Sequence, residues 1–129
     1  MNTKTLHRIL YIEDEADIQA VARLALEALG GFTVDTCSSG REGIARAQAT
    51  APDLILLDVM MPDMDGPATL QALRQVPALA DVPVVFMTAK VQPQEVAHYR
   101  ALGALAVIAK PFDPMLLARQ VRDIWLTQA

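Results

Sequence analysis

The chain has 129 residues, enough for one ordinary domain with a hydrophobic core of its own, so no second domain is expected. Its hydrophobic fraction is 53%, yet every apolar run is far too short to cross a bilayer, which argues against membrane insertion. The formal net charge is −4, no run of Lys or Arg occurs, and no secretion signal opens the chain, so the composition disfavours direct nucleic-acid binding and favours the cytoplasm.

The chain begins with a strand signal followed by a helix signal. Residues 9–12 are a short apolar run that ends in the acids at 13–15, a pattern typical of a buried strand. Asp14 or Glu15 can cap the helix that follows, and the glycines at 30–31 end it. The apolar face expected for this helix consists of Ile18, Val21, Ala22, Ala25 and Leu29.

A second strand and helix follow. Residues 32–37 alternate in hydrophobicity like a strand covered on one side only, which predicts an edge position in the sheet. Ser39 and Glu42 have the spacing of a capping box, so a helix is expected from there to about Thr50.

The centre of the chain changes character abruptly at Asp58. Four unbroken aliphatic residues, 54–57, precede this acid, with Pro52 before them and Pro62 after. Such a run predicts a strand that is buried on both faces of a parallel sheet, with Asp58 at its carboxyl end. Ligands of open α/β sheets bind at that edge, so Asp58 is a candidate nucleophile or metal ligand. The alternative is that Asp58 only begins a turn.

A third helix and a fourth strand come next. The helix starts after Gly66, carries Leu70 and Leu73, and ends near Val76. Residues 82–87 then form another apolar run, which ends at Thr88.

The last part of the chain repeats the pattern. Pro93 suits the first turn of a fourth helix, which Gly103 closes, and residues 105–109 predict a fifth strand. Asp113 can cap the last helix, with Pro114 at its first position. The apolar faces expected for these two helices consist of Val96, Tyr99 and Leu102, and of Leu117, Val121 and Ile124.

Strand and helix therefore alternate five times, which predicts a parallel sheet with right-handed crossovers. Because parallel strands place their carboxyl ends together, Glu13-Asp14, Asp58, Thr88 and Lys110 should meet at one edge. Three converging carboxylates repel one another unless a cation lies between them, and Mg²⁺ is the natural candidate. Asp14 and Asp58 could then bind it directly, and Glu13 through water.

The same set of side chains suits phosphoryl chemistry. A carboxylate such as that of Asp58 can attack phosphorus and form an acyl phosphate. The phosphoryl oxygens would be met by the metal, the Lys110 ammonium, the Thr88 hydroxyl and backbone N–H groups of the loop that follows Asp58.

These residues resemble a known family. Glu13-Asp14, the sequence D-V-M-M-P-D-M-D-G from Asp58, Thr88-Ala89 and Lys110-Pro111-Phe112 resemble the receiver domain of two-component response regulators over essentially the whole chain. The resemblance implies a flavodoxin-like (βα)5 three-layer sandwich with a five-stranded parallel sheet in the order 2-1-3-4-5. It also implies that residues 1–129 are a single receiver domain without an effector domain.

The resemblance assigns roles to the residues as well. It implies that Asp58 accepts a phosphoryl group from a histidine kinase or a histidine phosphotransfer protein, and that the domain then switches conformation to control a partner or output domain. Asp14, Asp58 and the Met60 carbonyl would hold Mg²⁺ with the support of Glu13, and Thr88 and Lys110 would contact the phosphoryl group. Any catalysis would act on the chain itself, so it would not be an enzyme towards other molecules. The Lys110-Pro111 bond is expected to be cis.

Three positions stand out beside this pattern. The family usually has Tyr or Phe where this chain has Val107, which either packs as an ordinary strand residue or lacks the ring that relays the Thr88 movement. Met60 and Lys90 occupy the two positions where the family tunes hydrolysis of the acyl phosphate. Met60 is expected to screen attacking water; alternatively, the methionines of this loop form a docking surface.

Other functions remain as alternatives. A dehalogenase-like phosphatase also combines Asp, Thr and Lys, but that class requires a second acid two residues after the nucleophile, where this chain has Met60. A flavodoxin-type electron carrier would need a Ser/Thr-rich phosphate loop in place of the acids after the first strand. A pseudoreceiver that only binds is disfavoured because every phosphorylation residue is present. Tyr99, Trp125 and the last two helices could form a homodimer or output surface, although amphipathic packing explains them better.

Overall fold

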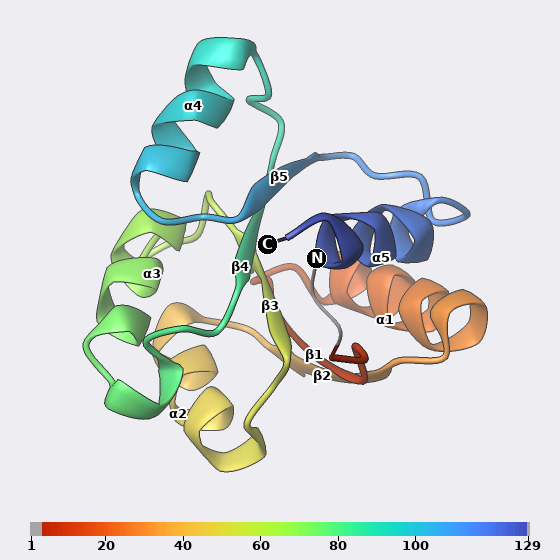
Figure 1. Cartoon of the computed structure of the whole chain (residues 1–129), viewed down its shortest axis with the longest axis horizontal. Helices are drawn as coiled ribbons and strands as arrows, with labels where there is room; N and C mark the ends of the chain where they lie inside the picture. Colours follow the sequence, from red (N-terminus) through yellow and green to blue (C-terminus); the bar gives the residue numbers. More distant parts are fainter. Residues whose placement is uncertain (1–3, 129) are drawn as a thin grey trace.

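Five parallel strands form the central sheet of the computed structural model, which describes residues 4–128. They lie in the order β2-β1-β3-β4-β5, so the predicted order is confirmed and β2 is an edge strand as expected. Figure 1 shows the sheet between two layers of helices. The strands are β1 (Arg8–Ile12), β2 (Thr33–Cys37), β3 (Leu54–Asp58), β4 (Val84–Thr88) and β5 (Ala106–Ala109).

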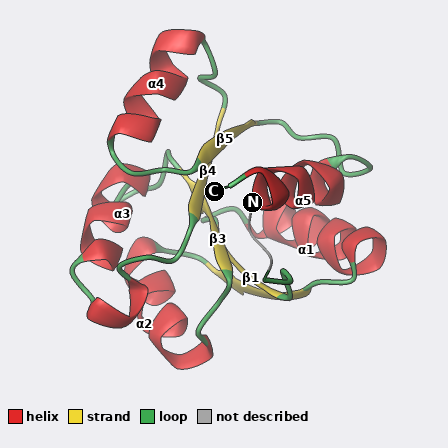
Figure 2. Cartoon of the chain, viewed as in Figure 1, coloured by secondary structure: helices red, strands yellow, loops and turns green. Residues whose placement is uncertain are grey.

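The helices cover both faces of the sheet, which confirms the three-layer sandwich. α1 and α5 lie on one side, and α2, α3 and α4 lie on the other (Figures 1 and 2). A short 3-10 helix that the sequence did not predict, η1 (Pro77–Leu79), precedes β4. The α-helices are α1 (Ala16–Gly30), α2 (Gly40–Thr50), α3 (Gly66–Arg74), α4 (Pro93–Ala101) and α5 (Leu117–Thr127). None of the helices within residues 4–128 is long and apolar enough to span a membrane.

The central strand β3 explains why its sequence is apolar without interruption. Leu54 and Leu56 point into the core beneath α1 and α5, whereas Ile55 and Leu57 point into the core beneath α2, α3 and α4. All four side chains are fully buried. Burying a side chain of this size stabilises a fold by about 1.5–3 kcal/mol, so β3 anchors both layers and fixes the position of the residue at its end.

The inward face of α1 was predicted only in part, since Ile18, Ala22 and Ala25 pack inward as expected. Val21 and Leu29 are 45% and 51% exposed, and Leu26 is fully buried together with Ala22. Because nearly every turn of this helix carries apolar residues, periodicity alone did not distinguish the face that meets β2 and α5 from its neighbour. The end of the helix was predicted correctly, since Gly31 takes a left-handed conformation with a φ of 71° and caps it.

The last helix starts later than predicted. α5 begins at Leu117 rather than at Pro114, and no side chain caps it. The Asp113 carboxylate instead accepts a hydrogen bond from the Met115 N–H at 2.8 Å, which closes a local turn before the helix.

The predicted cap of α2 is present, since the Ser39 hydroxyl accepts from the Glu42 N–H at 3.1 Å.

The apolar face of α4 was predicted only in part. Tyr99 is buried and meets Phe86 of β4 edge to face, with 5.2 Å between ring centroids, whereas Leu102 is 44% exposed. Trp125 of α5 is buried too, and its indole N–H donates to the Lys4 carbonyl at 2.8 Å. The burial of Tyr99 and Trp125 supports the packing interpretation of these residues over a dimer or output surface.

Candidate functional site

The predicted site residues lie at one edge of the sheet because the strands are parallel. Glu13 and Asp14 directly follow β1, and Asp58 is the last residue of β3. Thr88 ends β4, and Lys110 directly follows β5. The structure therefore brings these residues, far apart in sequence, to the carboxyl ends of four neighbouring strands.

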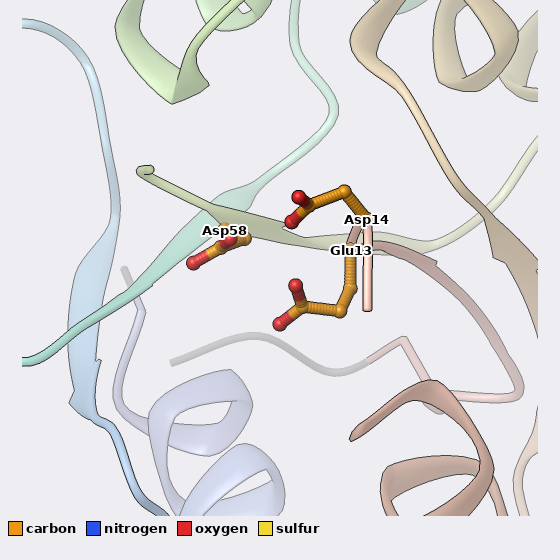
Figure 3. Close-up of side chains that lie close together, drawn as sticks. All are labelled: Glu13, Asp14 and Asp58. Atoms are coloured by element: carbon orange, nitrogen blue, oxygen red, sulfur yellow. The ribbon is translucent and has the colours of Figure 1, made fainter. Parts of the chain in front are cut away.

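Three carboxylates meet at this edge. Glu13, Asp14 and Asp58 each offer an oxygen atom, and these atoms lie within 4.8 Å of one another. Figure 3 shows the three side chains converging from β3 and from the segment that follows β1. Glu13 and Asp58 are buried, with exposed fractions of 0% and 3%, and Asp14 is exposed at the rim. The cluster therefore opens to solvent on the side of Asp14.

Lys110 bridges two of these acids. Its ammonium group donates to Glu13 Oε1 at 2.6 Å and to Asp58 Oδ1 at 3.1 Å. The ammonium thus lies between the two buried acids, closer to Glu13. The peptide bond between Lys110 and Pro111 is cis, as predicted.

The positive charge of Lys110 lowers the pKa of Glu13 but does not prevent the pKa values of Asp58 and Asp14 from rising. Burial and the neighbouring charge of Glu13 raise the pKa of Asp58 from 3.8 to about 6, although Lys110 opposes the shift. Partial desolvation and the nearby Glu13 also raise the pKa of Asp14, although its side chain lies at the exposed rim. Burial favours a higher pKa for Glu13 as well, but the hydrogen bond and charge of Lys110 hold it below its usual value. Two of the three carboxylates are therefore under-neutralised.

The donor set fits a hard divalent cation. Oxygen atoms of carboxylates are the ligands that Mg²⁺ and Ca²⁺ prefer, and one ammonium group cannot neutralise three acids. Asp14 and Asp58 carry the uncompensated charge, whereas both oxygens of Glu13 already accept hydrogen bonds from the protein. The cluster could therefore hold a metal ion mainly through Asp14 and Asp58.

Two loops border the acids. The Thr88 hydroxyl accepts a hydrogen bond from the Lys90 N–H at 3.1 Å, and Thr88 itself is buried. The side chains of Lys90 and Met60 point outward, and Met60 is 70% exposed. Glycine is required at position 66, because a Cβ there would come within 2.8 Å of the Asp58 carbonyl oxygen.

Val107 lies on β5, where the family usually has an aromatic residue. Its side chain is half-buried and packs against the core beneath α2, α3 and α4. That core also contains Phe86 and Tyr99. The position is therefore consistent with an ordinary packing role for Val107.

The structure adds two residues that the sequence did not single out. Tyr11 is fully buried, and its hydroxyl donates to Glu13 Oε1 at 3.1 Å. The Gln19 side-chain amide donates to the Glu13 carbonyl and, at 3.2 Å, to the Cys37 carbonyl. The period-two alternation of β1 would have placed Tyr11 and Glu13 on one face, but no sequence signal marks Gln19.

Comparison with known proteins agrees with this geometry. The family model described as the response regulator receiver domain matches residues 9–122. The chain belongs to this family. As a receiver domain of two-component response regulators, it is a signalling switch in two-component signal transduction.

The individual similarities extend along most of the receiver domain. It is 38% identical over 115 residues to the phosphate regulon transcriptional regulatory protein PhoB of Rhizobium meliloti, covering 88% of this chain and 50% of that protein. It is 35% identical to a probable C4-dicarboxylate response regulator DctR of Halalkalibacterium halodurans, covering 87% of this chain and 48% of that protein. The chain thus spans about half the length of these curated relatives.

Solved structures give the same result. The chemotaxis response regulator CheY4 of Vibrio cholerae matches with a TM-score of 0.85 and 29% identity, covering 93% of this chain and 99% of that one. The N-terminal domain of a response regulator receiver protein from Methanoculleus marisnigri matches with a TM-score of 0.73 and 34% identity, covering 97% and 100%. The receiver fold is thus supported by sequence and by structure.

Proposed function

We propose that Asp58 is the phosphoryl acceptor of this receiver domain. The donor would be the phosphohistidine of a histidine kinase or of a histidine phosphotransfer protein, and the reaction would depend on Mg²⁺. The observation that carries the proposal is the position of Asp58: a buried carboxylate at the carboxyl end of the central strand, 3.1 Å from an ammonium group and clustered with two further acids.

The residues of the chain have separate roles in this reaction. An Asp58 oxygen attacks phosphorus while the bond from phosphorus to the imidazole nitrogen breaks, and the imidazole leaves with the electron pair. Lys110 neutralises charge on the phosphoryl oxygens, and the Thr88 hydroxyl donates a hydrogen bond to one of them. The Lys110 ammonium already lies 3.1 Å from Asp58 before the reaction, so its charge needs little reorganisation.

Asp14, Asp58 and the Met60 carbonyl would hold Mg²⁺, with Glu13 in support. When bound, the ion supplies positive charge that offsets the repulsion between the acids and the incoming phosphoryl group. Asp58 then remains ionised at neutral pH, which a nucleophile requires. Met60 shields the acyl phosphate from water on the open side, and Lys90 borders the same opening.

Phosphorylation would bias the domain between two conformations, one of which a partner or output domain binds better. Relatives such as PhoB are transcriptional regulators about twice the length of this chain, so the output lies either in a partner protein or in an attached domain. We place the switch in the cytoplasm, with residues 1–129 acting as one receiver domain. Its chemistry would be confined to gaining and losing its own phosphoryl group.

Intact-mass measurement after incubation with Mg²⁺ and acetyl phosphate tests the proposal. The parent protein should gain one phosphoryl group that hydroxylamine removes, and Asp58→Asn should gain none. Asp63→Asn is the matched control, because Asp63 is an exposed acid on the same loop and outside the cluster.

The proposal would be wrong if the parent gained no mass while another receiver domain was labelled in parallel. Equal labelling of Asp58→Asn and the parent would also contradict it, because the acceptor would then be a different residue. Labelling that persisted without Mg²⁺ at the same rate would contradict the metal requirement alone.

A further inference from the structure

Tyr11 is a buried tyrosine whose hydroxyl donates a hydrogen bond to one acid of the cluster, Glu13. Its side chain is completely buried in β1, on the sheet face that α1 and α5 cover. The core around it is apolar, and the partner of the hydroxyl is Glu13 Oε1, at 3.1 Å. A tyrosine hydroxyl is seldom buried without a specific hydrogen-bond partner, so this contact fixes the ring and the carboxylate relative to each other.

Both oxygens of the Glu13 carboxylate accept hydrogen bonds from the protein. Oε1 accepts hydrogen bonds from Tyr11 and, at 2.6 Å, from Lys110. Oε2 accepts from the Glu15 N–H at 3.3 Å. Because Lys110 also binds Asp58, the four side chains form a continuous chain of contacts that runs from the core through Glu13 and Lys110 to Asp58.

The contact depends on the length of the glutamate side chain. Tyr11 and Glu13 are two residues apart and therefore project from the same face of the strand. The hydroxyl and the carboxylate meet above that face. An aspartate at position 13 would be one methylene shorter and would withdraw its carboxylate from the hydroxyl.

We infer that Tyr11 is a positioning residue of this site, which fixes the Glu13 carboxylate and thereby sets the arrangement of Lys110 and the metal-binding acids. The inference rests on the proposed function. Tyr11 itself touches neither the metal nor the phosphoryl group; it acts only through Glu13. Side chains that hydrogen-bond to the residues of a metal site commonly contribute about 10–100-fold to the affinity for the metal. The loss of the Tyr11 hydroxyl should therefore change the Kd for Mg²⁺ measurably.

A double-mutant cycle tests the inference by calorimetric titration with Mg²⁺. The four proteins are the parent, Tyr11→Phe, Glu13→Asp and the double variant. Tyr11→Phe removes one oxygen and keeps the ring, and it should raise the Kd for Mg²⁺ roughly tenfold. In the Glu13→Asp background the same change should have little effect, because the contact is already lost. Tyr99→Phe is the control, since Tyr99 is a buried tyrosine beneath the opposite helix layer.

A merely structural role for Tyr11 would give a different result. It would lower the stability to urea and leave the Kd for Mg²⁺ within twofold of the parent, and this outcome would overturn the inference. An equal effect of Tyr11→Phe in both backgrounds would overturn it too. A parent that does not bind Mg²⁺ would instead overturn the proposed function, and this inference with it.

A second measurement needs no variant of Tyr11. In the parent, the Tyr11 hydroxyl proton should exchange slowly enough to be observed by NMR, and the Glu13→Asp substitution should abolish its signal. Rapid exchange in the parent would show that the hydroxyl is not held by Glu13 and would overturn the inference even if Tyr11→Phe failed to fold.

Discussion

Lys110 is bound more closely by Glu13 than by the proposed phosphoryl acceptor. Its Nζ lies 2.6 Å from Glu13 Oε1, and the contact to Asp58 is longer, at 3.1 Å. The short contact with Glu13 holds Lys110 in place. The longer contact with Asp58 leaves the ammonium charge available to a phosphoryl group added to Asp58. This division of one positive charge between two acids leads to specific expectations.

Replacing the lysine should separate catalysis from metal binding. Lys110→Ala should slow phosphorylation by acetyl phosphate about 100-fold, because a positioned charge on the phosphoryl oxygens is lost. The same variant should bind Mg²⁺ more tightly, because three carboxylates then lack their cation. Phosphorylation kinetics and calorimetry measure the two effects. Arg119→Ala is the charge-matched control on the exposed side of α5, and weaker Mg²⁺ binding by Lys110→Ala would contradict the expectation.

The Asp58 carboxylate should reduce the stability of the folded protein at neutral pH when no Mg²⁺ is bound. The pKa of Asp58 is raised from 3.8 to about 6, so the folded state binds the proton more tightly than the unfolded state. Stability should therefore fall as the pH rises through this window and stay lower above it. Asp58→Asn removes the effect and should raise the free energy of unfolding by roughly 1–3 kcal/mol at about pH 7.

Urea denaturation without Mg²⁺, repeated between about pH 4 and pH 8, measures this difference. The gain in Asp58→Asn should vanish at the acid end, where Asp58 is already neutral. Asp63→Asn, outside the acidic cluster, is the control. A variant that is less stable than the parent at neutral pH would contradict the expected sign.

Mg²⁺ should stabilise the folded protein by mass action. At ten times its Kd, the ion should raise the free energy of unfolding by about 1.4 kcal/mol, provided that the unfolded chain does not bind it. Chelation should reverse the gain, and Asp14→Asn should reduce it. Thermal unfolding at constant ionic strength is the measurement. An equal gain from NaCl would show that the effect is screening of surface charge instead of binding.

The loop after the acceptor should control the lifetime of the phosphorylated state. Met60 is 70% exposed and stands two residues after Asp58, so its apolar side chain can hinder water at the opening. Met60→Asn should lose phosphate several-fold faster than the parent. Met115→Asn is a closely matched control, because Met115 is 71% exposed and precedes α5. If Met60→Asn loses phosphate no faster than the parent, the shielding role is wrong.

The sequence predicted the sheet well because each strand had a local signal. The uninterrupted aliphatic run of β3 can be accommodated only by burial on both faces, and the alternation in β2 suits an edge. Helix faces and the start of α5 were predicted less well. Asp113 was assigned to a cap, but it closes a turn of its own, and a single acid before an apolar stretch allows both structures.

The sequence predicted that the candidate residues meet at one edge of the sheet, but it did not predict the contacts among them. Parallel strands dictate that Asp58 and Lys110 meet at one edge, which follows from topology alone. The shorter contact of Lys110 with Glu13 depends instead on side-chain reach, and the Tyr11 hydroxyl binds the same Glu13 oxygen. A strand pattern identifies the face from which a side chain projects, but not the distance to which it extends.

The loop between Asp58 and α3 is closed on itself. The Gly66 N–H donates to the Val59 carbonyl at 2.9 Å, and the absence of a side chain at Gly66 lets the helix start rest against the strand end. A hydrogen bond therefore closes the segment 59–66 directly after Asp58. The residue that follows Asp58 is thereby tied to the first residue of α3 by a backbone hydrogen bond. Removing this bond would let the end of β3 and the start of α3 shift independently.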